Sequence, residues 1–280
     1  MLIQHTQPAN WPAILVPAHL STIDPGMLWS AGLLAALACS LWMARRDNLN
    51  SRTMYWAGVF AILFGLWGGY LLGLYYHGTD GRSWAWLRPW SGGEAEYGGL
   101  LTGMLAVFIY LRIRKQPFLP YADAIVPAVA FGVAIGRIGC FLNGDDFGTR
   151  SNLPWAVTFP PGTEAYSDHV WRGWLAPDAP QSLPVHPVQL YMTFFALALF
   201  VFLATWHPAR SGVRFGGFLA IYGGARFLQQ FLRGDFQAVL GPFSLTQLIS
   251  VALIILGLTV VYLRSRHGRE ITMAVVPQIS

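Results

Sequence analysis

The chain has 280 residues, of which 54% are hydrophobic and only 11% are charged. Because a soluble globular domain carries about 25% charged residues, this composition excludes an ordinary soluble enzyme and indicates a polytopic membrane protein. The net charge of +5 comes almost entirely from arginine, and no long soluble basic module accompanies it. Basic loops beside membrane spans therefore explain the charge better than a nucleic-acid partner does.

Residues 1–26 form a polar, proline-rich lead-in without the basic start of a cleavable signal peptide. Seven apolar segments follow, each long enough or nearly long enough to cross a bilayer as a helix. They cover residues 27–44, 54–76, 98–111, 124–142, 188–206, 215–232 and 243–263. We therefore predict an all-α fold with one seven-helix transmembrane domain over residues 27–263 and a cytoplasmic tail at 264–280.

The distribution of positive charge predicts the orientation of these segments. Loops after the first, third, fifth and seventh segments hold eleven of the 18 Lys and Arg residues, and the opposite loops hold five. By the positive-inside rule, the N-terminus lies outside and the C-terminus lies in the cytoplasm. The two longest loops, at about 77–97 and 143–187, then face outward, and the second is long enough to be a functional loop.

Two arginines lie inside the predicted spans. Arg137 is near the end of the fourth segment and Arg226 is in the outer half of the sixth. An arginine at the centre of a bilayer helix costs roughly 2.5–3.5 kcal/mol, so each needs an anionic partner. Because a planar guanidinium binds phosphate through two hydrogen bonds, we interpret the pair as a site for a phospholipid headgroup in the outer leaflet.

Other polar residues are predicted at the same depth. Helical spacing places Tyr222, Arg226, Gln230 and Arg233 on one face of the sixth segment. At the same surface the third segment begins with Tyr97, Gly98 and Gly99, and the fifth begins near His186 and Gln189. The agreement of four separate segments is the main argument from the residues alone for one outward-facing site.

Simpler interpretations stay open for each of these residues. Arg137 also fits a structural ion pair with a carboxylate such as Asp145, and Arg226 also fits a side chain that snorkels along its helix. The Gly98–Gly99 pair also fits close helix contact, and His186 also fits a helix cap. No His or Cys pair has zinc-ligand spacing and no Gly-Lys-Ser/Thr phosphate loop is present, so we predict no metal and no soluble cofactor.

The thirteen residues 136–148, Gly-Arg-Ile-Gly-Cys-Phe-Leu-Asn-Gly-Asp-Asp-Phe-Gly, resemble the signature of the phosphatidylglycerol–prolipoprotein diacylglyceryl transferase family. Three further pieces are similar in the same order. Residues 97–100 resemble a His-Gly-Gly-Leu segment, residues 186–191 a His-Pro-x-Gln-Leu-Tyr segment, and residues 222–233 the last catalytic helix. The likeness covers roughly residues 25–265.

The resemblance implies an activity, partners and a location. Family enzymes move the diacylglyceryl group of phosphatidylglycerol onto the lipobox cysteine thiol of a preprolipoprotein, and glycerol phosphate leaves. This implies a multi-pass protein of the bacterial inner membrane, with its active site toward the periplasmic leaflet. Catalytic roles fall on Arg137, Arg226 and Tyr97, and substrate-binding roles on Arg137, Asn143, Gly148, Gly98, Gly99, His186, Gln230 and Arg233.

The chain departs from the family pattern at several site positions. Tyr97 replaces the family's histidine, and a phenol with a pKa of about 10 is a poor base near neutral pH. Gln230 replaces a glutamate and Cys140 replaces an asparagine, while Trp67 and Leu28 stand where an arginine and a tyrosine are expected.

These departures leave two interpretations. In the first, the chain is a divergent transferase whose base lies elsewhere, with Glu94, Glu96, Asp145 and His186 as candidates. In the second, it is a paralogue that binds anionic phospholipid and has altered or lost the chemistry.

Overall fold

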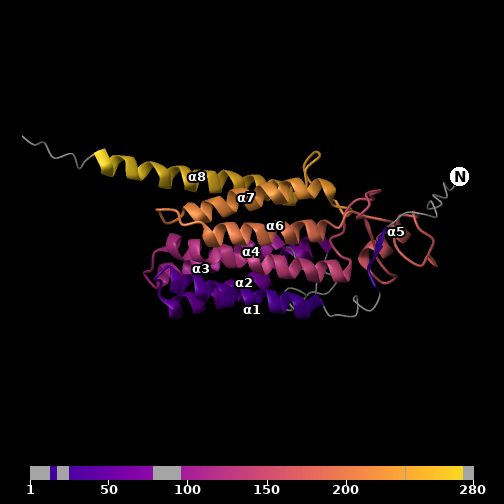
Figure 1. Ribbon diagram of the computed structural model, residues 1–280, viewed down its shortest axis with the longest axis horizontal. Helices are drawn as coiled ribbons and strands as arrows, with labels where there is room; N and C mark the ends of the chain where they lie inside the picture. Colours follow the sequence, from indigo (N-terminus) through magenta and orange to yellow (C-terminus); the bar gives the residue numbers. More distant parts are fainter. Residues whose placement is uncertain (1–12, 18–24, 78–95, 237, 274–280) are drawn as a thin grey trace, which may run out of the picture. The chain divides into compact units, whose positions relative to one another are not determined.

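The computed structural model describes residues 13–17, 25–77, 96–236 and 238–273, which are mainly helical (Figure 1). The helices are α1 (Pro25–Arg46), α2 (Ser51–His77), α3 (Glu96–Ile113), α4 (Phe118–Asn143), α5 (Glu164–Trp171), α6 (Val188–Thr205), α7 (Val213–Gln229), the 3-10 helix η2 (Gln230–Leu232) and α8 (Leu245–Met273). Two short strands, β1 (Ile14–Leu15) and β2 (Val157–Thr158), pair in parallel.

Every apolar segment predicted from the sequence contains a helix, so the predicted all-α class is confirmed. Among the described residues, five helices are long and apolar enough to cross a membrane: α1, α2, α4, α6 and α8. The protein is therefore a multi-pass membrane protein. Helix α3 is apolar but shorter, and the total of seven spans, the domain limits and the orientation stay predictions. Most of the predicted loop at 77–97 lies outside the described residues.

The helical face predicted through Arg233 is wrong, although the helical segment itself ends at Leu232 as predicted. Helix α7 ends at Gln229, and after η2 the backbone of Arg233 is extended, with φ −75° and ψ 132°. Arg233 forms an antiparallel bridge with Gly148, flanked by a hydrogen bond of 2.8 Å from Thr149 N–H to Leu232 O. Pairing with the 143–187 loop therefore replaces the helical face that we predicted through Arg233.

Helix ends follow local sequence signals. At the start of α2, the Asn50 side chain accepts the Thr53 N–H at 2.9 Å, which satisfies one of the free backbone donors of the first turn. Before α8, Ser244 and Gln247 accept each other's backbone N–H groups in a capping box. Helix α4 ends where Gly144 adopts φ +71°, a conformation that glycine reaches without strain.

The chain divides into two compact units. Unit 1 contains residues 1–34, 130–200 and 224–248, and it includes the long 143–187 loop. That loop has a hydrophobic cluster of its own, formed by Val16, Phe147, Val157, Phe159, Ala165 and Val185. Burial lowers the pKa of His169 to about 4, so its ring is neutral and Nδ1 accepts the Leu183 N–H at 3.2 Å. These contacts explain how a connection of this length is folded.

Unit 2 contains residues 35–129, 201–223 and 249–280. In it, α2 and α3 lie side by side and approach closely at glycines (Figure 1). A Cβ atom on Gly98 would lie 2.3 Å from the Gly68 carbonyl oxygen, and one on Gly99 would lie 3.1 Å from that of Gly65. Close helix contact, one of the two interpretations above, is therefore what the structure gives for these glycines, and their role in substrate binding stays a prediction.

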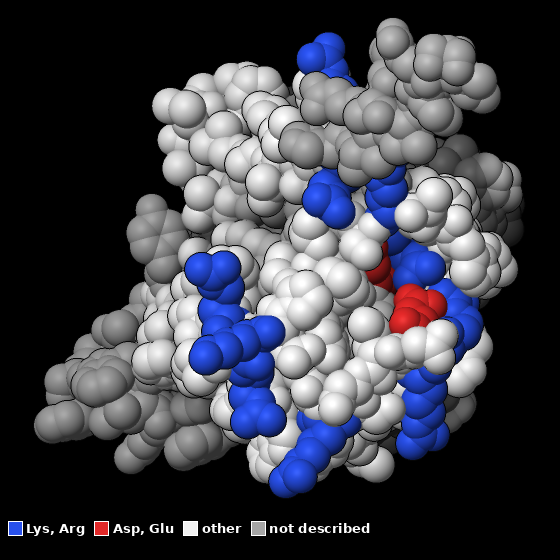
Figure 2. Space-filling view, turned by 90° about the vertical axis from the view of Figure 1, so that its left-hand side faces the viewer, with Lys and Arg blue, Asp and Glu red and all other residues white. Residues whose placement is uncertain are grey.

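Basic side chains gather at the end of unit 2 where the loops after α1, α3 and α6 lie (Figure 2). Arg214 is buried there and donates to Asp47 Oδ2 at 2.9 Å and to the Asp123 carbonyl at 3.1 Å. Pro127, inside α4, has no N–H to give that carbonyl. Arg214 thus satisfies the backbone acceptor that the proline leaves without its helical donor.

The buried side chain of Asp123 fixes the start of α7. Its two carboxylate oxygens accept the backbone N–H groups of Gly212 and Phe215, each at 2.6 Å. Asp123→Ala leaves both donors without this acceptor, at a cost of about 1–3 kcal/mol for each buried group. We expect a lower thermal unfolding midpoint in detergent for Asp123→Ala and a smaller decrease for Asp123→Asn, which keeps one acceptor. Equal midpoints for both variants and the parent would contradict this role.

Candidate functional site

The centre of the candidate site is an ion pair at the end of α4. Arg137 is only 2% exposed, and its guanidinium pairs with the carboxylate of Asp146, which lies beyond the end of the helix. Gly144 and Asp146 both have positive φ, +71° and +54°. This turn folds the carboxylate back onto the arginine, so the embedded cation has an internal counterion. The sequence suggested Asp145 as a candidate partner of Arg137, but the partner in the structure is Asp146.

A second arginine shares the same carboxylate. Arg233 Nη2 lies 2.5 Å from Asp146 Oδ1 and also pairs with Asp235. Burial alone would raise the pKa of Asp146, but Arg233 and Arg137 outweigh burial and hold that pKa well below its usual range, and Arg226 acts in the same direction. Unit 1 thus brings two guanidiniums onto one ionised carboxylate, and Arg226 adds to the positive field at that carboxylate.

The third arginine, Arg226, is 5% exposed and lies in the last turn of α7. Its Nη1 donates to Gln229 Oε1 at 2.5 Å, and Gln229 Nε2 donates to the Val188 carbonyl at 3.2 Å. Gln229 therefore connects the arginine to the first residue of α6. Gln230, the residue predicted from the sequence, is also buried, but the contact to Arg226 is made by Gln229, which the i, i+3 spacing from Arg226 could have indicated.

Asp145 is held between α4 and α6. Asn143 Nδ2 donates to its Oδ2 at 2.7 Å, and Gln189 Nε2 donates to its backbone carbonyl at 2.6 Å. Burial and the adjacent charge of Asp146 raise the pKa of Asp145 to about 6. This carboxyl therefore changes its protonation near neutral pH, whereas Asp146 stays ionised.

One group of possible metal-ligating atoms occurs among the described residues. Ligand atoms of Cys140, Asp145 and Asp146 lie within 4.8 Å of one another. Two arginines already neutralise Asp146, and Arg137 lies one helical turn before Cys140. The positive charge around these atoms disfavours the binding of a metal cation and favours the binding of an anion.

His186 and Gly148 join the loop to the start of α6. The Gly148 N–H donates to the His186 carbonyl at 3.2 Å, and the His186 ring contacts the Tyr191 hydroxyl with Nδ1 at 3.3 Å. Burial lowers the pKa of His186, so its ring is mainly neutral at pH 7. In the structure His186 acts as a connector, and its predicted substrate role stays a prediction.

A side chain at position 148 is expected to disrupt this junction. A Cβ atom there would lie 2.4 Å from the His186 carbonyl oxygen, which is backbone and cannot rotate away. Overpacking of this kind costs typically about 1–3 kcal/mol, so Gly148→Ala should lower the unfolding midpoint. Gly224→Ala is the matched control, because no atom lies within 4 Å of a Cβ placed there. A midpoint for Gly148→Ala equal to that of the control would contradict the close approach.

Tyr97 belongs to unit 2, as do Gly98 and Gly99. Its side chain is 3% exposed, and its hydroxyl shares a 2.7 Å hydrogen bond with Ser250 Oγ of α8. The structure therefore brings together Arg137, Asn143, Gly148, Arg226 and Arg233 within unit 1, while the place of Tyr97 beside them stays a prediction. The candidate bases Glu94 and Glu96 lie outside the described side chains.

Comparison with known proteins gives one consistent result. The family model described as "Prolipoprotein diacylglyceryl transferase" matches residues 22–263. Three similar proteins are each named phosphatidylglycerol–prolipoprotein diacylglyceryl transferase. One from Photobacterium profundum is 32% identical, covering 90% of this chain and 92% of the relative. One from Vibrio campbellii is 30% identical over 87% and 86%, and one from Clostridium tetani is 30% identical over 84% and 90%. The chain therefore belongs to the prolipoprotein diacylglyceryl transferase family of enzymes.

Proposed function

We propose that the chain transfers the diacylglyceryl group of phosphatidylglycerol to the lipobox cysteine of preprolipoproteins, at the periplasmic side of a bacterial inner membrane. The observation that carries the proposal is the cluster of Arg137, Arg226 and Arg233 around Asp146. Family membership and the names of the relatives support the same reaction.

The charges of the cluster suit one phospholipid phosphate. Arg137, Arg226 and Arg233 carry three positive charges against the two negative charges of Asp146 and Asp235, which leaves one net positive charge among these five groups. A phosphodiester carries one negative charge and matches this surplus, and the negative charge of ionised Asp145 is removed when that carboxylate takes the thiol proton. Planar guanidiniums bind its oxygens through paired, charge-assisted hydrogen bonds, and Asn143 at the end of α4 adds an amide for the glycerol headgroup.

The proposed reaction replaces a carbon–oxygen bond of the lipid with a carbon–sulfur bond. The thiol proton passes to a carboxylate base, and the sulfur forms a bond to the diacylglyceryl carbon while the bond from that carbon to the phosphate oxygen breaks. The leaving glycerol phosphate gains a second negative charge as the base becomes neutral, so charge is conserved. Arg137 and Arg226 stabilise this developing charge in a site with little water.

Asp145 is the base that the geometry supports best. A general base is most effective when its pKa lies near the pH at which the enzyme works. Burial raises the pKa of Asp145 to about 6. Its carboxyl lies within 4.8 Å of the Cys140 thiol, so one thiol of the chain already lies beside it. Glu164, at the start of α5, has an exposed side chain and so lacks the enclosed position of Asp145.

A second candidate function is a paralogue that binds anionic phospholipid without transfer. It is favoured by Tyr97, whose hydroxyl is hydrogen-bonded to Ser250 at the position of the family's histidine. Purified protein, phosphatidylglycerol labelled in its acyl chains and a lipobox peptide distinguish the two. A transferase converts the peptide to a labelled thioether, whereas a binding paralogue retains labelled lipid without converting peptide.

The variant Tyr97→His tests whether tyrosine, in place of the family's histidine, lowers the transfer rate. If the imidazole supplies a base that the phenol lacks, its transfer rate should exceed the parental rate, by up to about 10²-fold for one positioned base. Tyr97→Phe is the control, because it removes the hydroxyl without adding a base. A rate for Tyr97→His at or below that of Tyr97→Phe would show that position 97 has no proton-transfer role.

A further inference from the structure

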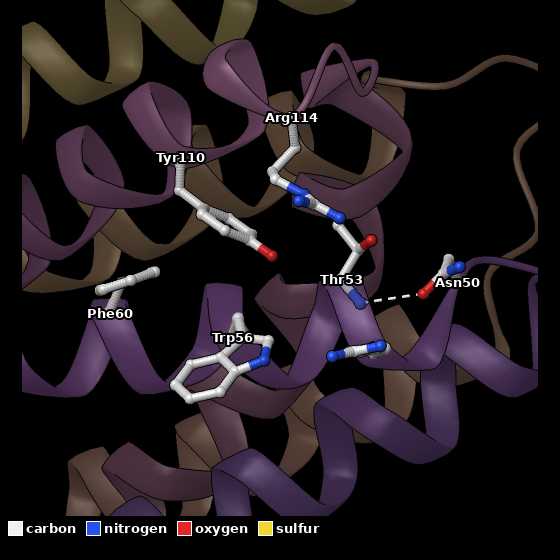
Figure 3. Close-up of a pocket in the computed structure, with 7 residues that line it drawn as sticks. Asn50, Thr53, Trp56, Phe60, Tyr110 and Arg114 are labelled. Carbon is white, nitrogen blue, oxygen red and sulfur yellow. Dashed lines mark hydrogen bonds between the residues drawn. The ribbon is translucent and has the colours of Figure 1, made fainter.

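A pocket opens in unit 2, between the start of α2 and the end of α3 (Figure 3). Its volume is about 700 Å³. Seven residues line it: Asn50, Arg52, Thr53, Trp56, Phe60, Tyr110 and Arg114. None of them belongs to the arginine cluster of unit 1, and the proposed transfer reaction does not use them.

The pocket has two cationic side chains and no acidic one. Arg52 belongs to the first turn of α2, and Arg114 follows the last turn of α3. Within the part of the chain that the structure describes, neither guanidinium makes an ion pair. The Asn50 amide and the Tyr110 hydroxyl add further polar groups around the same space (Figure 3). This lining is complementary to an anion with several oxygen atoms.

Aromatic rings form the apolar side of the pocket. The rings of Phe60 and Tyr110 have centroids 5.1 Å apart, and those of Trp56 and Phe60 are 6.3 Å apart. Tryptophan and tyrosine concentrate where a membrane helix passes from the headgroup region into the hydrocarbon. The pocket therefore combines a cationic opening with an amphipathic aromatic wall, as expected at the membrane interface.

An exposed apolar stripe continues from the pocket along α2. Positions 56, 60, 63, 64 and 67 lie on one helical face, because steps of three or four residues lead from 56 to 60, from 60 to 63 and 64, and from these two to 67. Trp56, Leu63 and Phe64 on this face are 44%, 58% and 44% exposed. In a membrane-spanning helix such a face meets acyl chains, so a ligand with a charged head and an apolar tail can follow it.

We propose that this pocket binds the headgroup of an anionic phospholipid, in the leaflet at the basic end of unit 2, with an acyl chain along the exposed face of α2. A zwitterionic headgroup offers the two arginines no net charge. A basic signal-peptide start would be repelled by them. The lipid would occupy a site formed by residues other than those of the proposed donor site.

The test compares two variants that lose equal charge. Arg52→Gln/Arg114→Gln removes both pocket guanidiniums, and Arg45→Gln/Arg112→Gln removes two exposed arginines that do not line the pocket. Detergent-purified proteins are mixed with phosphatidylglycerol or phosphatidylcholine, and bound lipid is counted by native mass spectrometry. We expect the pocket variant to retain one anionic lipid fewer than the parent and the control, with at least about 10-fold weaker binding.

Three results would overturn the proposal. One is equal retention of phosphatidylglycerol by the pocket variant and the control variant. Another is equal retention of phosphatidylglycerol and phosphatidylcholine at this site by the parent. The third concerns the charge-conserving Arg52→Lys/Arg114→Lys variant, which should recover part of the binding: no recovery with an intact unfolding midpoint would contradict the proposal. Transfer activity unchanged in the pocket variant separates this site from the donor site, since the donor-site proposal stands or fails on its own assay.

Discussion

Arg137→Gln is expected to lower the rate of diacylglyceryl transfer by about 10²–10³-fold, the usual effect of removing one preorganised donor from a developing negative charge. Arg137 is buried and pairs with Asp146 at the centre of the cluster. Its guanidinium is the donor that would lie against the departing phosphate. The measurement is the single-turnover conversion of a lipobox peptide at saturating phosphatidylglycerol, because it reports chemistry apart from lipid affinity.

Two further variants separate charge from geometry. Arg137→Lys keeps the positive charge but loses the planar fork, so it should retain the unfolding midpoint better than Arg137→Gln and still transfer slowly. Arg150→Gln is the matched control, because this exposed arginine of the 143–187 loop lies over the Trp174 ring, 4.2 Å from its centroid, and has no part in the cluster. Parental rates in both Arg137 variants would remove this residue from the mechanism.

Asp145→Asn is the second change with a large expected effect, a loss of about 10²–10⁴-fold if this carboxylate is the general base. The amide keeps the shape of the side chain and can still accept a hydrogen bond from Asn143, but it cannot take a proton from the thiol. A loss of transfer with unchanged phosphatidylglycerol binding and an unchanged unfolding midpoint is the result that assigns the proton-transfer role.

The pH profile gives an independent check on the same residue. A base acts in its ionised form, and burial together with Asp146 raises the pKa of Asp145 to about 6. Transfer should therefore be constant above this pH and fall about tenfold per unit below it. If Glu164 were the base, the decrease would begin near pH 7, where its pKa lies, and Glu164→Gln would abolish transfer. We expect Glu164→Gln to keep the parental profile.

The helices were predictable because their signal is local. Long apolar runs, basic loop ends and an Asn-Gly turn after position 142 mark α4 and the other helices in the sequence itself. The presence of Arg137 in such a run also indicated that an anion must lie nearby. What remained open was which anion, because the candidates differ only in how the following turn folds.

The partners in the cluster depend on tertiary contacts that spacing does not contain. Asp146 reaches Arg137 through a left-handed backbone conformation at an aspartate, which few residues other than glycine adopt. Arg233 reaches the same carboxylate because residues after η2 pair with the loop near Gly148. Helical spacing predicted that Arg233 lies on the same face as Arg226. Arg233 does reach the cluster, but its backbone there is extended and not helical.

The most direct measurement is a structure of the protein with bound phosphatidylglycerol, or with a phosphonate analogue in which a CH2 group replaces the phosphate oxygen on the diacylglyceryl carbon. We expect one phosphate group with oxygens about 2.7–2.9 Å from guanidinium nitrogens of both Arg137 and Arg226, and its glycerol headgroup near Asn143. A lipid phosphate in contact with neither arginine, or with Arg226 alone while Arg137 keeps only Asp146, would contradict this expectation.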